Sequence, residues 1–420
     1  MRVLIVNTSE RTGGAAIAAS RLKDALIDNG VKAKMLVRTK ESDNVSVAQL
    51  RQTPMLRFNF LWERGRIWLA NGLSRDHLFD IDTATRGSDI TRLPEFKEAD
   101  VIHLHWVNQG MLSLGVLRKI LASGKPVVWT MHDMWPFTGI CHYAHDCQRY
   151  VGGCHDCPLL KKPGEKDLSW QVFHRKEETY KPGKMAFVAC SRWLADQARQ
   201  SRLLRGTRVT DIPNPISTSL FKPRDKEKVR EACRLPQDKK LILFSAFRTT
   251  SPIKGLNYFA EACKLYDRRH PEMREQIAIV AVGRDAEQLQ GMFTYPVYPM
   301  GYVSDEHRMA DIYNACDAFL MPSLQDNLPN TIVEAMASGL PCIATAVGGI
   351  PQMIHHLENG YLAEPRQADD LCRGLEWLFT CNYSMVSKAA RSFAVNEYSE
   401  HNVAMRYIEI YNQLCNTFYE

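Results

Sequence analysis

The chain has 420 residues, of which 45% are hydrophobic and 24% are charged. This length exceeds what one hydrophobic core usually serves, and the composition excludes collagenous, low-complexity and wholly disordered proteins. The net charge of +6 is uneven: residues 1–210 hold 32 Lys and Arg against 21 Asp and Glu, and the remainder holds 21 against 26. A basic first half suits nucleic acid, an anionic membrane surface or a phosphorylated substrate.

The first half alternates short apolar runs with helical patterns, beginning with a helix that opens at Gly13-Gly14. Such alternation is typical of a parallel sheet with helices on both faces. The predicted strands span 2–7, 33–38, 100–105, 126–133, 186–190 and 209–213.

A segment rich in Pro, Ser and Asn at 212–225 is a candidate linker. The alternation then restarts with strands at 241–247, 277–283, 318–322 and 341–346, and the last ~55 residues have helical patterns. We therefore predict an α/β fold of two tandem Rossmann-like, doubly wound domains. Their expected bounds are 1–213 and 214–395, with a C-terminal helix at 396–420 that packs back toward the first domain.

The opening MRVLIVN is too short for a signal-peptide core. No apolar run approaches the ~18 residues needed to cross a bilayer. We therefore expect a cytoplasmic protein, in which the twelve cysteines are thiols or metal ligands rather than a disulfide scaffold.

Cationic side chains follow the first strand of the second half. Arg248 comes directly after the strand, and Lys254 precedes Gly255 at the start of a helix. A guanidinium, an ammonium and a helix N-terminus together form an anion site suited to a diphosphate. Without context, the same spacing also fits two surface cations in a solvated turn.

Two carboxylates follow the third predicted strand of this half. Asp326 lies in the loop and Glu334 lies one turn into the next helix. Carboxylates accept hydrogen bonds from vicinal hydroxyls, as in ribose recognition, so this pair indicates a sugar or nucleoside ligand. Gly348-Gly349 after the next strand allows the backbone to approach a ligand closely.

Over essentially its whole length the chain resembles the family-4 retaining glycosyltransferases, which have the GT-B fold of two domains facing a cleft. The resemblance rests on Gly13-Gly14, His132 after a strand, Asn214-Pro215, Arg248 with Lys254, Gly301-Tyr302-Val303 and, most specifically, PSLQDNLPNTIVEAMASGLP at 322–341. It implies that the first domain faces the acceptor and that the second binds a nucleotide sugar.

The resemblance also implies roles for single residues. The catalytic set would be His132, Arg248, Lys254 and Asp326, with the two cations on the diphosphate. Donor contacts would come from Gly13, Gly14, Arg248, Lys254, Tyr302, Val303, Asn327, Leu328 and Glu334, of which Glu334 holds the ribose. Asp326 departs from the glutamate usual in the family and is one methylene shorter, which bears on reach, donor choice and rate.

The function implied is retaining transfer of a sugar from a UDP- or GDP-linked donor to a glycan or lipid-linked acceptor, in bacterial surface polysaccharide synthesis. No catalytic metal is expected, because no Asp-x-Asp motif lies beside the donor region. Two alternatives stay open. One is an epimerase or phosphorylase of the same fold, and the other is a GT-B binding module without turnover.

A cysteine-rich loop spans residues 141–157. Cys141, Cys147, Cys154 and Cys157 have a C-x5-C-x6-C-x2-C spacing that could supply a tetrahedral structural zinc site. Free or redox-active thiols and disulfides are the alternatives.

The segment from Arg51 to Arg75 places aromatic and apolar residues at helical spacing among five arginines. It could be an interfacial helix at the inner face of the cell membrane, in contact with anionic lipid. Alternatively, it covers the core of the first domain with its arginines in water. Nucleic acid is not expected, because no recognition motif accompanies the charge.

Overall fold

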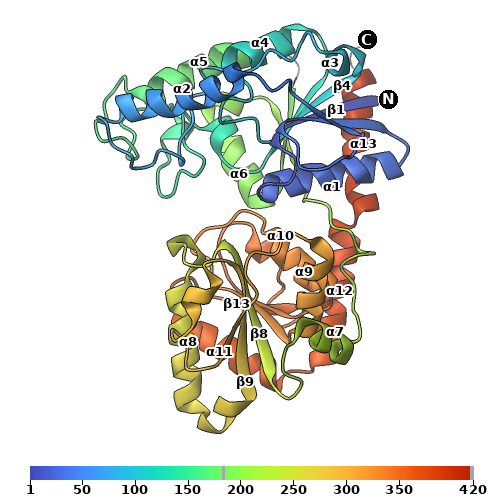
Figure 1. The fold of residues 1–420 in the computed structure, drawn as a ribbon. Coiled ribbons are helices and arrows are strands. Elements are labelled where there is room, and N and C mark those ends of the chain that lie inside the picture. The colour runs from blue at the N-terminus through green and yellow to red at the C-terminus, as the bar shows by residue number, and fades with distance from the viewer. Residues whose placement is uncertain (182–184, 417–420) are drawn as a thin grey trace. The chain divides into compact units, whose positions relative to one another are not determined.

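The computed structural model describes residues 1–181 and 185–416. The chain forms two compact units, of which unit 1 comprises Met1–Pro215 and the residues from Val403 onward, and unit 2 comprises Ile216–Asn402. Each unit is a parallel sheet covered by helices (Figure 1), so the prediction of two Rossmann-like domains is confirmed. The first predicted boundary, at 213/214, lies two residues before the end of the first segment of unit 1.

Unit 1 contains seven strands: β1 (Arg2–Ser9), β2 (Lys32–Thr39), β3 (Val47–Gln49), β4 (Val101–Leu104), β5 (Val127–Met131), β6 (Met185–Ala189) and β7 (Arg208–Asp211). They pair in the order β3-β2-β1-β4-β5-β6-β7. Ile5 of β1 is aligned with Met35 of β2 on one side and with His103 of β4 on the other. The strand order therefore reverses between β1 and β4.

The helices of unit 1 are α1 (Gly14–Asp28), α2 (Pro54–Ala70), α3 (Pro94–Glu98), α4 (Leu114–Ala122), α5 (Leu168–Tyr180), α6 (Arg192–Gln200) and most of α13 (Glu400–Asn416). Figure 1 shows α1 and α13 on one face of the sheet and α4 and α5 on the other. The core on the first face joins apolar residues of β1, β2 and α1 to Val403 and Tyr407.

The last helix is tied to the sheet of unit 1 by two buried phenol groups. The Tyr407 hydroxyl lies 2.8 Å from Thr130 Oγ1, and the Tyr411 hydroxyl lies 2.7 Å from His103 Nδ1. These side chains are fully buried, so the end of the described chain is an integral part of the first domain. Residues 417–420 of the predicted C-terminal segment lie outside the described residues.

Unit 2 contains six strands: β8 (Lys240–Arg248), β9 (Ile277–Arg284), β10 (Val297–Pro299), β11 (Ala318–Met321), β12 (Cys342–Thr345) and β13 (Gly360–Ala363). Their order is β10-β9-β8-β11-β12-β13, which reverses between β8 and β11. The helices are α7 (Lys226–Cys233), α8 (Leu256–Arg269), α9 (Glu306–Ala315), α10 (Asn330–Ala337), α11 (Ala368–Thr380) and α12 (Tyr383–Tyr398). In Figure 1, α8 and α11 cover one face and α7, α9, α10 and α12 the other.

The strands that the sequence patterns did not predict are short. β3 and β10 have three residues each and β13 has four. All three lie toward the outer parts of their sheets, where an apolar run need not be long. No helix among the described residues is both long and apolar enough to span a bilayer.

Candidate functional site

The loops that follow β8 and β11 meet where the strand order of unit 2 reverses. Ligands of open parallel sheets bind at this position. Leu324 N donates a hydrogen bond to Ile253 O over 2.8 Å, which ties the two loops together. Gly255 has a φ of 68°, and a Cβ there would lie 1.9 Å from Pro322 O. Only glycine therefore permits this approach of the loops.

An ion pair joins the same two loops. Lys254 Nζ lies 2.6 Å from Asp326 Oδ2, and the side chains are 24% and 15% exposed. Arg248, at the end of β8, is exposed, and no acceptor in the described part of the chain contacts its guanidinium. At the carboxyl ends of these strands, Lys254 is therefore a neutralised cation and Arg248 an available one. Both precede the N-terminus of α8. This combination can bind an anion.

The turn after β12 is packed against the loop that carries Asp326. Gly348 has a φ of 54°, and a Cβ there would lie 1.8 Å from Asp326 O. Gly349 N donates to Asn327 O over 2.8 Å. Asn327 and Leu328 are buried, so their main chain forms a fixed part of this edge.

Glu334 lies in α10 and is buried. Its Oε2 accepts a hydrogen bond of 2.8 Å from the hydroxyl of Tyr313, which is fully buried in α9. The phenol fixes the orientation of the carboxylate, which is what a group that recognises a pair of hydroxyls needs.

An exposed aromatic cluster lies beyond the ends of β8 and β9. The rings of Phe247 and Tyr302 are 5.5 Å apart and nearly perpendicular, and the Arg284 guanidinium lies 4.7 Å from the Phe247 centroid and 5.5 Å from that of Tyr302. Val303 next to it is half-buried. Sequence reasoning missed Phe247 and Arg284, although each stands at the end of a predicted strand, where ligand-binding residues gather.

Gly13, Gly14 and His132 lie in unit 1, and the other predicted donor and catalytic residues lie in unit 2. Gly13 caps α1 with a φ of 91°, a conformation that L side chains rarely adopt. His132 directly follows β5 and is half-buried. All three residues therefore lie beyond the carboxyl ends of strands of unit 1.

His132 belongs to a group of three imidazoles. Its Nε2 lies 2.9 Å from His105 Nδ1, and the His103 ring lies 4.4 Å from that of His105. Burial lowers the pKa of His132 to about 4 and that of His103 to about 3, and it also lowers the pKa of His105. The three rings are therefore neutral at physiological pH.

Asp133, next to His132, is the centre of a second buried group. Its Oδ2 accepts hydrogen bonds from Trp106 Nε1 over 2.9 Å and from His142 Nδ1 over 2.7 Å. Burial alone would lower the pKa of His142, but the Asp133 carboxylate raises it. Sequence reasoning gave no role to His105 and Asp133, although His-x-His ends the predicted strand at 100–105 and His-Asp ends the predicted strand at 126–133.

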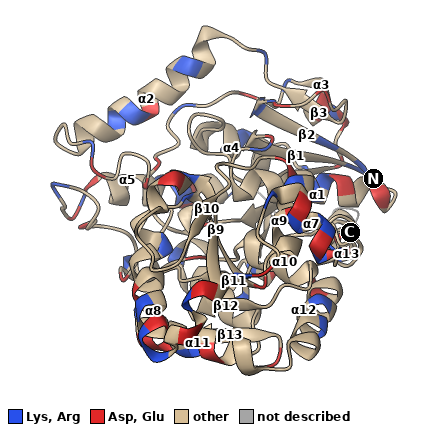
Figure 2. Ribbon diagram, turned by 60° about the horizontal axis from the view of Figure 1, so that its bottom comes forward, with Lys and Arg blue, Asp and Glu red and all other residues tan. Residues whose placement is uncertain are grey.

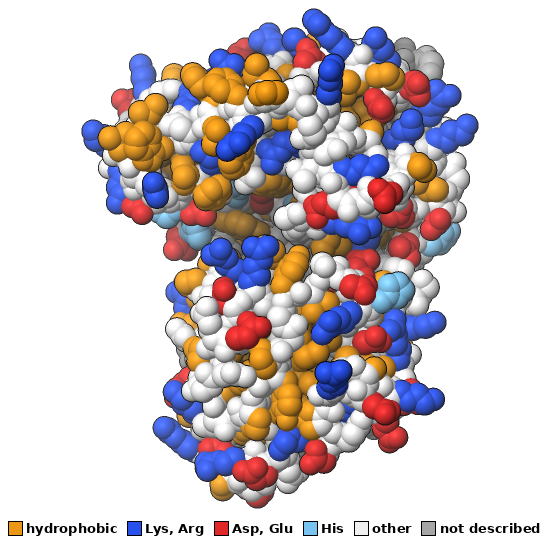
Figure 3. All heavy atoms as spheres, viewed as in Figure 1, with side chains coloured by type: hydrophobic (Ala, Val, Ile, Leu, Met, Phe, Trp, Pro, Cys, Tyr) orange, Lys and Arg blue, Asp and Glu red, His pale blue; other side chains and the backbone are white. Residues whose placement is uncertain are grey.

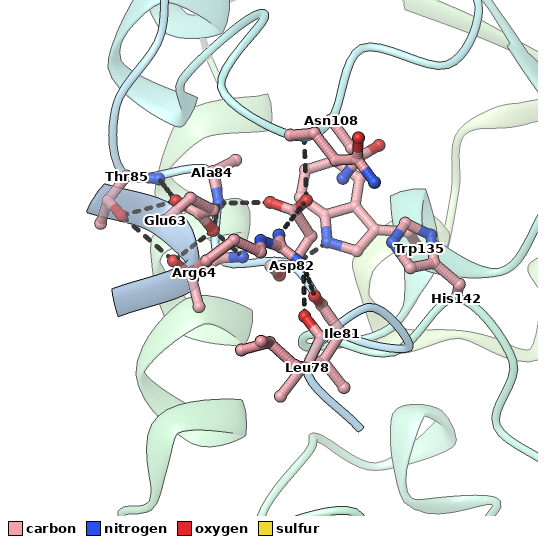
Figure 4. A network of polar contacts seen from close by, with 12 residues as sticks. Glu63, Arg64, Leu78, Ile81, Asp82, Ala84, Thr85, Asn108, Trp135 and His142 are labelled. Carbon is pink, nitrogen blue, oxygen red and sulfur yellow. Dashed lines mark hydrogen bonds and ion pairs between the residues drawn. The ribbon is translucent and has the colours of Figure 1, made fainter. Parts of the chain in front are cut away.

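Helix α2 buries polar side chains. The Glu63 carboxylate accepts hydrogen bonds from the backbone N–H groups and hydroxyls of Thr83 and Thr85 and from Ala84 N (Figure 4). Arg64 NH2 donates to Asp82 Oδ2 over 2.9 Å. Burial, followed by the neighbouring Glu63 charge, raises the pKa of Asp82 to about 7. This network holds the segment 78–85 against α2.

The opposite face of α2 is apolar and exposed. Its exposed apolar residues and those of the segment after it are Met55, Phe58, Leu61, Trp62, Trp68, Leu69, Leu73 and Phe79, which we call the α2 surface. Hydrophobic side chains gather in this part of unit 1 among Lys and Arg (Figure 3), and α2 itself is predominantly basic among its charges (Figure 2). The alternative of a helix covering the core with its arginines in water is therefore wrong for Arg64, which is buried beside Asp82.

The four cysteines of the predicted zinc loop line one cavity of about 20 Å³. All four are free, and burial raises the pKa of Cys141, Cys154 and Cys157 to about 12. Gly139 N lies 3.1 Å from Cys154 Sγ and is its hydrogen-bond donor. Within residues 1–181 and 185–416, no three His, Cys, Asp or Glu side chains already stand in an arrangement that could hold a metal ion.

Two family descriptions match the chain and together cover most of it. "Glycosyltransferase Family 4" matches residues 12–220, and "Glycosyl transferases group 1" matches residues 238–381. The first match covers β2 to β7 of unit 1, and the second covers all six strands of unit 2.

Similar curated proteins have the same length range. An uncharacterized glycosyltransferase, MJ1607 of Methanocaldococcus jannaschii, is 24% identical over 82% of this chain and 92% of its own length. WcaC of Escherichia coli, a glycosyl transferase provisionally assigned to colanic acid biosynthesis, is 23% identical over 82% of this chain and 83% of its own.

Solved structures share the fold of both units. Sucrose-phosphate synthase of Thermosynechococcus elongatus has a TM-score of 0.66 at 18% identity, with 99% of each chain covered. Anabaena Alr3699/HepE in complex with UDP-glucose has a TM-score of 0.63 at 16% identity, with 98% of this chain and all of the other covered.

Proposed function

We propose that this chain, which belongs to glycosyltransferase family 4 and has the GT-B fold, transfers a sugar with retention from a nucleotide diphosphate sugar to a hydroxyl of a glycan or lipid-linked acceptor. The observation that carries the proposal is the edge of the unit 2 sheet. There Arg248, the Lys254–Asp326 ion pair and Glu334 gather around the reversal of strand order. The UDP-glucose complex of HepE, a protein of the same fold, supports a nucleotide-sugar donor.

The two cations have distinct tasks in this proposal. Arg248 grips the diphosphate through its fork of N–H donors, and Lys254 neutralises the charge that grows on the leaving oxygen. Before the donor arrives, Asp326 neutralises Lys254. The incoming diphosphate competes for the ammonium, which leaves the Asp326 carboxylate to accept hydrogen bonds from the transferred sugar.

The nucleoside is bound by groups on both sides of the reversal point. Glu334, oriented by Tyr313, accepts hydrogen bonds from the ribose hydroxyls. The exposed rings of Phe247 and Tyr302 offer an apolar edge and face on which the base packs, beside the main chain of Val303. The buried main chain at Asn327 and Leu328 completes the donor pocket of this unit.

The reaction needs no protein nucleophile. The acceptor oxygen bonds to the anomeric carbon on the face from which the phosphate oxygen leaves, and that oxygen takes the acceptor's proton. The configuration of the sugar is thereby retained. Neutral His132, held by His105, supplies a hydrogen bond to the donor sugar, and Gly13-Gly14 lets the main chain approach it. The negative charge that develops on the leaving diphosphate is met by Arg248 and Lys254, so we assign no catalytic metal.

Product analysis with UDP- and GDP-linked hexoses tests this proposal. The wild type should release nucleoside diphosphate from one of them, and Lys254→Ala should lower kcat by about 10²–10³-fold, the cost typical of a lost oxyanion donor. The matched control is Lys228→Ala, because this lysine is an exposed cation of the same unit. Nuclear magnetic resonance of the initial product should show the anomeric configuration of the donor.

The same assay separates the alternatives. A binding module without turnover would release nothing, and an epimerase would return a nucleotide sugar instead of free diphosphate. A phosphorylase would require inorganic phosphate. Any of these results, or an inverted anomer, would contradict the proposal.

For the acceptor side, we propose that the α2 surface binds an anionic lipid bilayer at the inner face of the cell membrane. The exposed side chains of the helix are mainly apolar, with the cation of Arg57 among them, because Glu63 and Arg64 are engaged inside the protein. Exposed tryptophans beside basic residues suit the headgroup region, where each Lys or Arg contributes about 1 kcal/mol. Arg86 stacks on Phe58 and Trp62, so the cations and the aromatic rings form one surface.

Vesicle sedimentation tests the α2 surface. Leu61→Ser with Leu69→Ser should reduce binding to vesicles that contain phosphatidylglycerol, whereas binding to neutral phosphatidylcholine vesicles should be weak for every variant. The control is Met385→Ser with Met405→Ser, which removes exposed apolar side chains elsewhere. Equal binding of both double variants, or concentration-dependent self-association through this surface in place of lipid binding, would contradict the proposal.

A further inference from the structure

The strongest unassigned feature is the cavity surrounded by Cys141, Cys147, Cys154 and Cys157 in unit 1. A cavity needs roughly 10–15 Å³ to hold one water molecule, so about 20 Å³ accommodates a single small ion. These thiols have no role in the proposed binding of the donor, in the proposed transfer of the sugar or in the proposed contact with the membrane. Twelve cysteines are present, but these four share one small space.

We propose that the four thiols bind one Zn²⁺ as a structural site. Each sulfur gives up a proton to solvent and forms a bond to the metal, so that four thiolates and one Zn²⁺ make a complex of charge −2. Tetrahedral sulfur ligands select zinc or iron, and a cavity of this size excludes a polynuclear iron–sulfur cluster. The absence of a ready-made ligand set within the described residues means that binding must draw the sulfurs inward.

The surroundings of the cavity suit an anionic thiolate complex. Gly139 N already points at Cys154 Sγ from 3.1 Å, as an N–H donor to a thiolate does. Lys176 is fully buried nearby, with its Nζ 3.5 Å from the centre of the Trp135 ring and 3.1 Å from Thr138 O. Burial lowers the pKa of Lys176 to about 7, and the nearby Asp133 and Asp82 oppose this shift without forming an ion pair with it among the described residues. A thiolate complex would add negative charge beside this lysine and favour its protonated form.

The position of the cavity indicates what the metal would stabilise. Cys141 directly precedes His142, whose ring is held by Asp133. Cys157 N is held by Asp167, which also caps α5. Zinc would therefore join the loop that follows the His132–Asp133 pair to the N-terminus of α5. It would act on activity through the position of that loop and would not contact the substrate.

Metal analysis of the full-length protein tests the site. Protein purified under reducing conditions and exposed to Zn²⁺, then desalted, should retain about one zinc per chain. Cys147→Ser with Cys154→Ser should lose it, and the control Cys233→Ser with Cys381→Ser should keep it, because those two are half-buried thiols of unit 2. A mercurial reagent should release the zinc from the wild type, as measured with a metallochromic dye.

A second measurement does not depend on the folding of the variants. Wild-type protein reconstituted with Co²⁺ should show the intense d–d absorption of tetrahedral cobalt thiolate. Iron in place of zinc, disulfides among these four residues in protein handled without oxidant, an octahedral Co²⁺ spectrum, or zinc retained by the Cys147/Cys154 variant would each overturn the proposal. Donor binding by unit 2 should be unaffected by zinc removal, which separates this inference from the proposed transfer activity.

Discussion

Lys254 and Asp326 form an ion pair that joins the loops after β8 and β11 and neutralises the lysine. The Lys254 ammonium is 24% exposed and is held 2.6 Å from the Asp326 carboxylate, and in the proposed reaction the diphosphate replaces this carboxylate as its partner. The Asp326 main chain is fixed from the other side by Gly348, which lies against its carbonyl oxygen.

The burial of His132 leads to a prediction about how the activity depends on pH. Because burial lowers its pKa to about 4, the imidazole stays neutral across the physiological range. We expect kcat/KM to show no inflection from His132 between about pH 5.5 and about pH 8, and His132→Ala to lower kcat without changing the shape of the profile. A wild-type inflection near pH 6.5 that disappears in His132→Ala would contradict the burial argument.

Most residues at the edge of the unit 2 sheet where we propose donor binding could be predicted from the sequence, because they lie in the loops that follow apolar runs. Arg248, Asp326 and Gly348 are examples, and the strand order brings their loops together. Phe247 and Arg284 were missed although they stand at the ends of predicted strands, because hydrophobic periodicity does not show that such a side chain is exposed or which neighbour it contacts. Their contact depends on the pairing of β8 with β9, including the register shift between Ser245 and Arg248.

Helices and loops are held in place by a few close approaches, and Gly255 at the start of α8 is the clearest. In Gly255→Ala a methyl group would meet Pro322 O at 1.9 Å, so the loop after β8 must move away from the loop after β11. We expect nucleotide affinity to fall at least tenfold, about 1.4 kcal/mol. Calorimetric titration with UDP and GDP measures it.

Gly291→Ala is the matched control for this prediction. Gly291 also has a positive φ, of 81°, but no atom lies within 4 Å of the added Cβ. Nucleotide affinity should therefore be unchanged. Equal losses in the two variants would mean that backbone strain, rather than the contact with Pro322, is responsible.

Helix α2 depends on Glu63, whose carboxylate accepts at least five hydrogen bonds from a single segment. Glu63→Gln leaves buried donors without a full set of acceptors, which should destabilise unit 1 by about 3 kcal/mol. Thermal unfolding should show a lower Tm than in Glu98→Gln, which changes an exposed glutamate of α3. An unchanged Tm would refute the role of the network.

The orientation of α2 could not be predicted from the sequence. Phe58, Leu61 and Trp62 at helical spacing ordinarily face a core, but here the buried face holds Glu63 and Arg64. The reason lies in a contact distant in sequence: the segment 78–85 brings backbone and hydroxyl donors that the Glu63 carboxylate accepts. Periodicity identified the helix, and tertiary hydrogen bonds determined which face is inside.

At the scale of the whole molecule, the chain returns from unit 2 to complete unit 1. Tyr411 of α13 contacts His103, whose pKa burial lowers to about 3. Below about pH 6.5 the unfolded chain takes up a proton that the folded chain resists, so folding stability falls as the pH is lowered toward the folded pKa. The cost at about pH 5 is on the order of 2 kcal/mol for this histidine.

His103→Gln should therefore reduce the loss of Tm between about pH 7.5 and about pH 5. The control is His307→Gln, because His307 is exposed. Identical pH dependence in the wild type and both variants would contradict the assignment of this effect to the buried imidazole.

The uneven charge of the chain agrees with two different tasks for its halves. The basic first half contains the α2 surface, for which we propose anionic lipid, and the acidic second half contains a small local group of cations. Net charge therefore does not point to the proposed diphosphate site, which lies in the acidic half. Loop position at the reversal of strand order was the better guide.

Calorimetric titration of the full-length protein with UDP and GDP tests the central claim most directly. We expect one nucleotide to bind with about 1:1 stoichiometry, and Arg248→Ala and Lys254→Ala each to weaken it by at least tenfold while Lys228→Ala has no effect. Failure of both nucleotides to bind the wild type, or equal affinities in all four proteins, would show that the edge between β8 and β11 is not a diphosphate site.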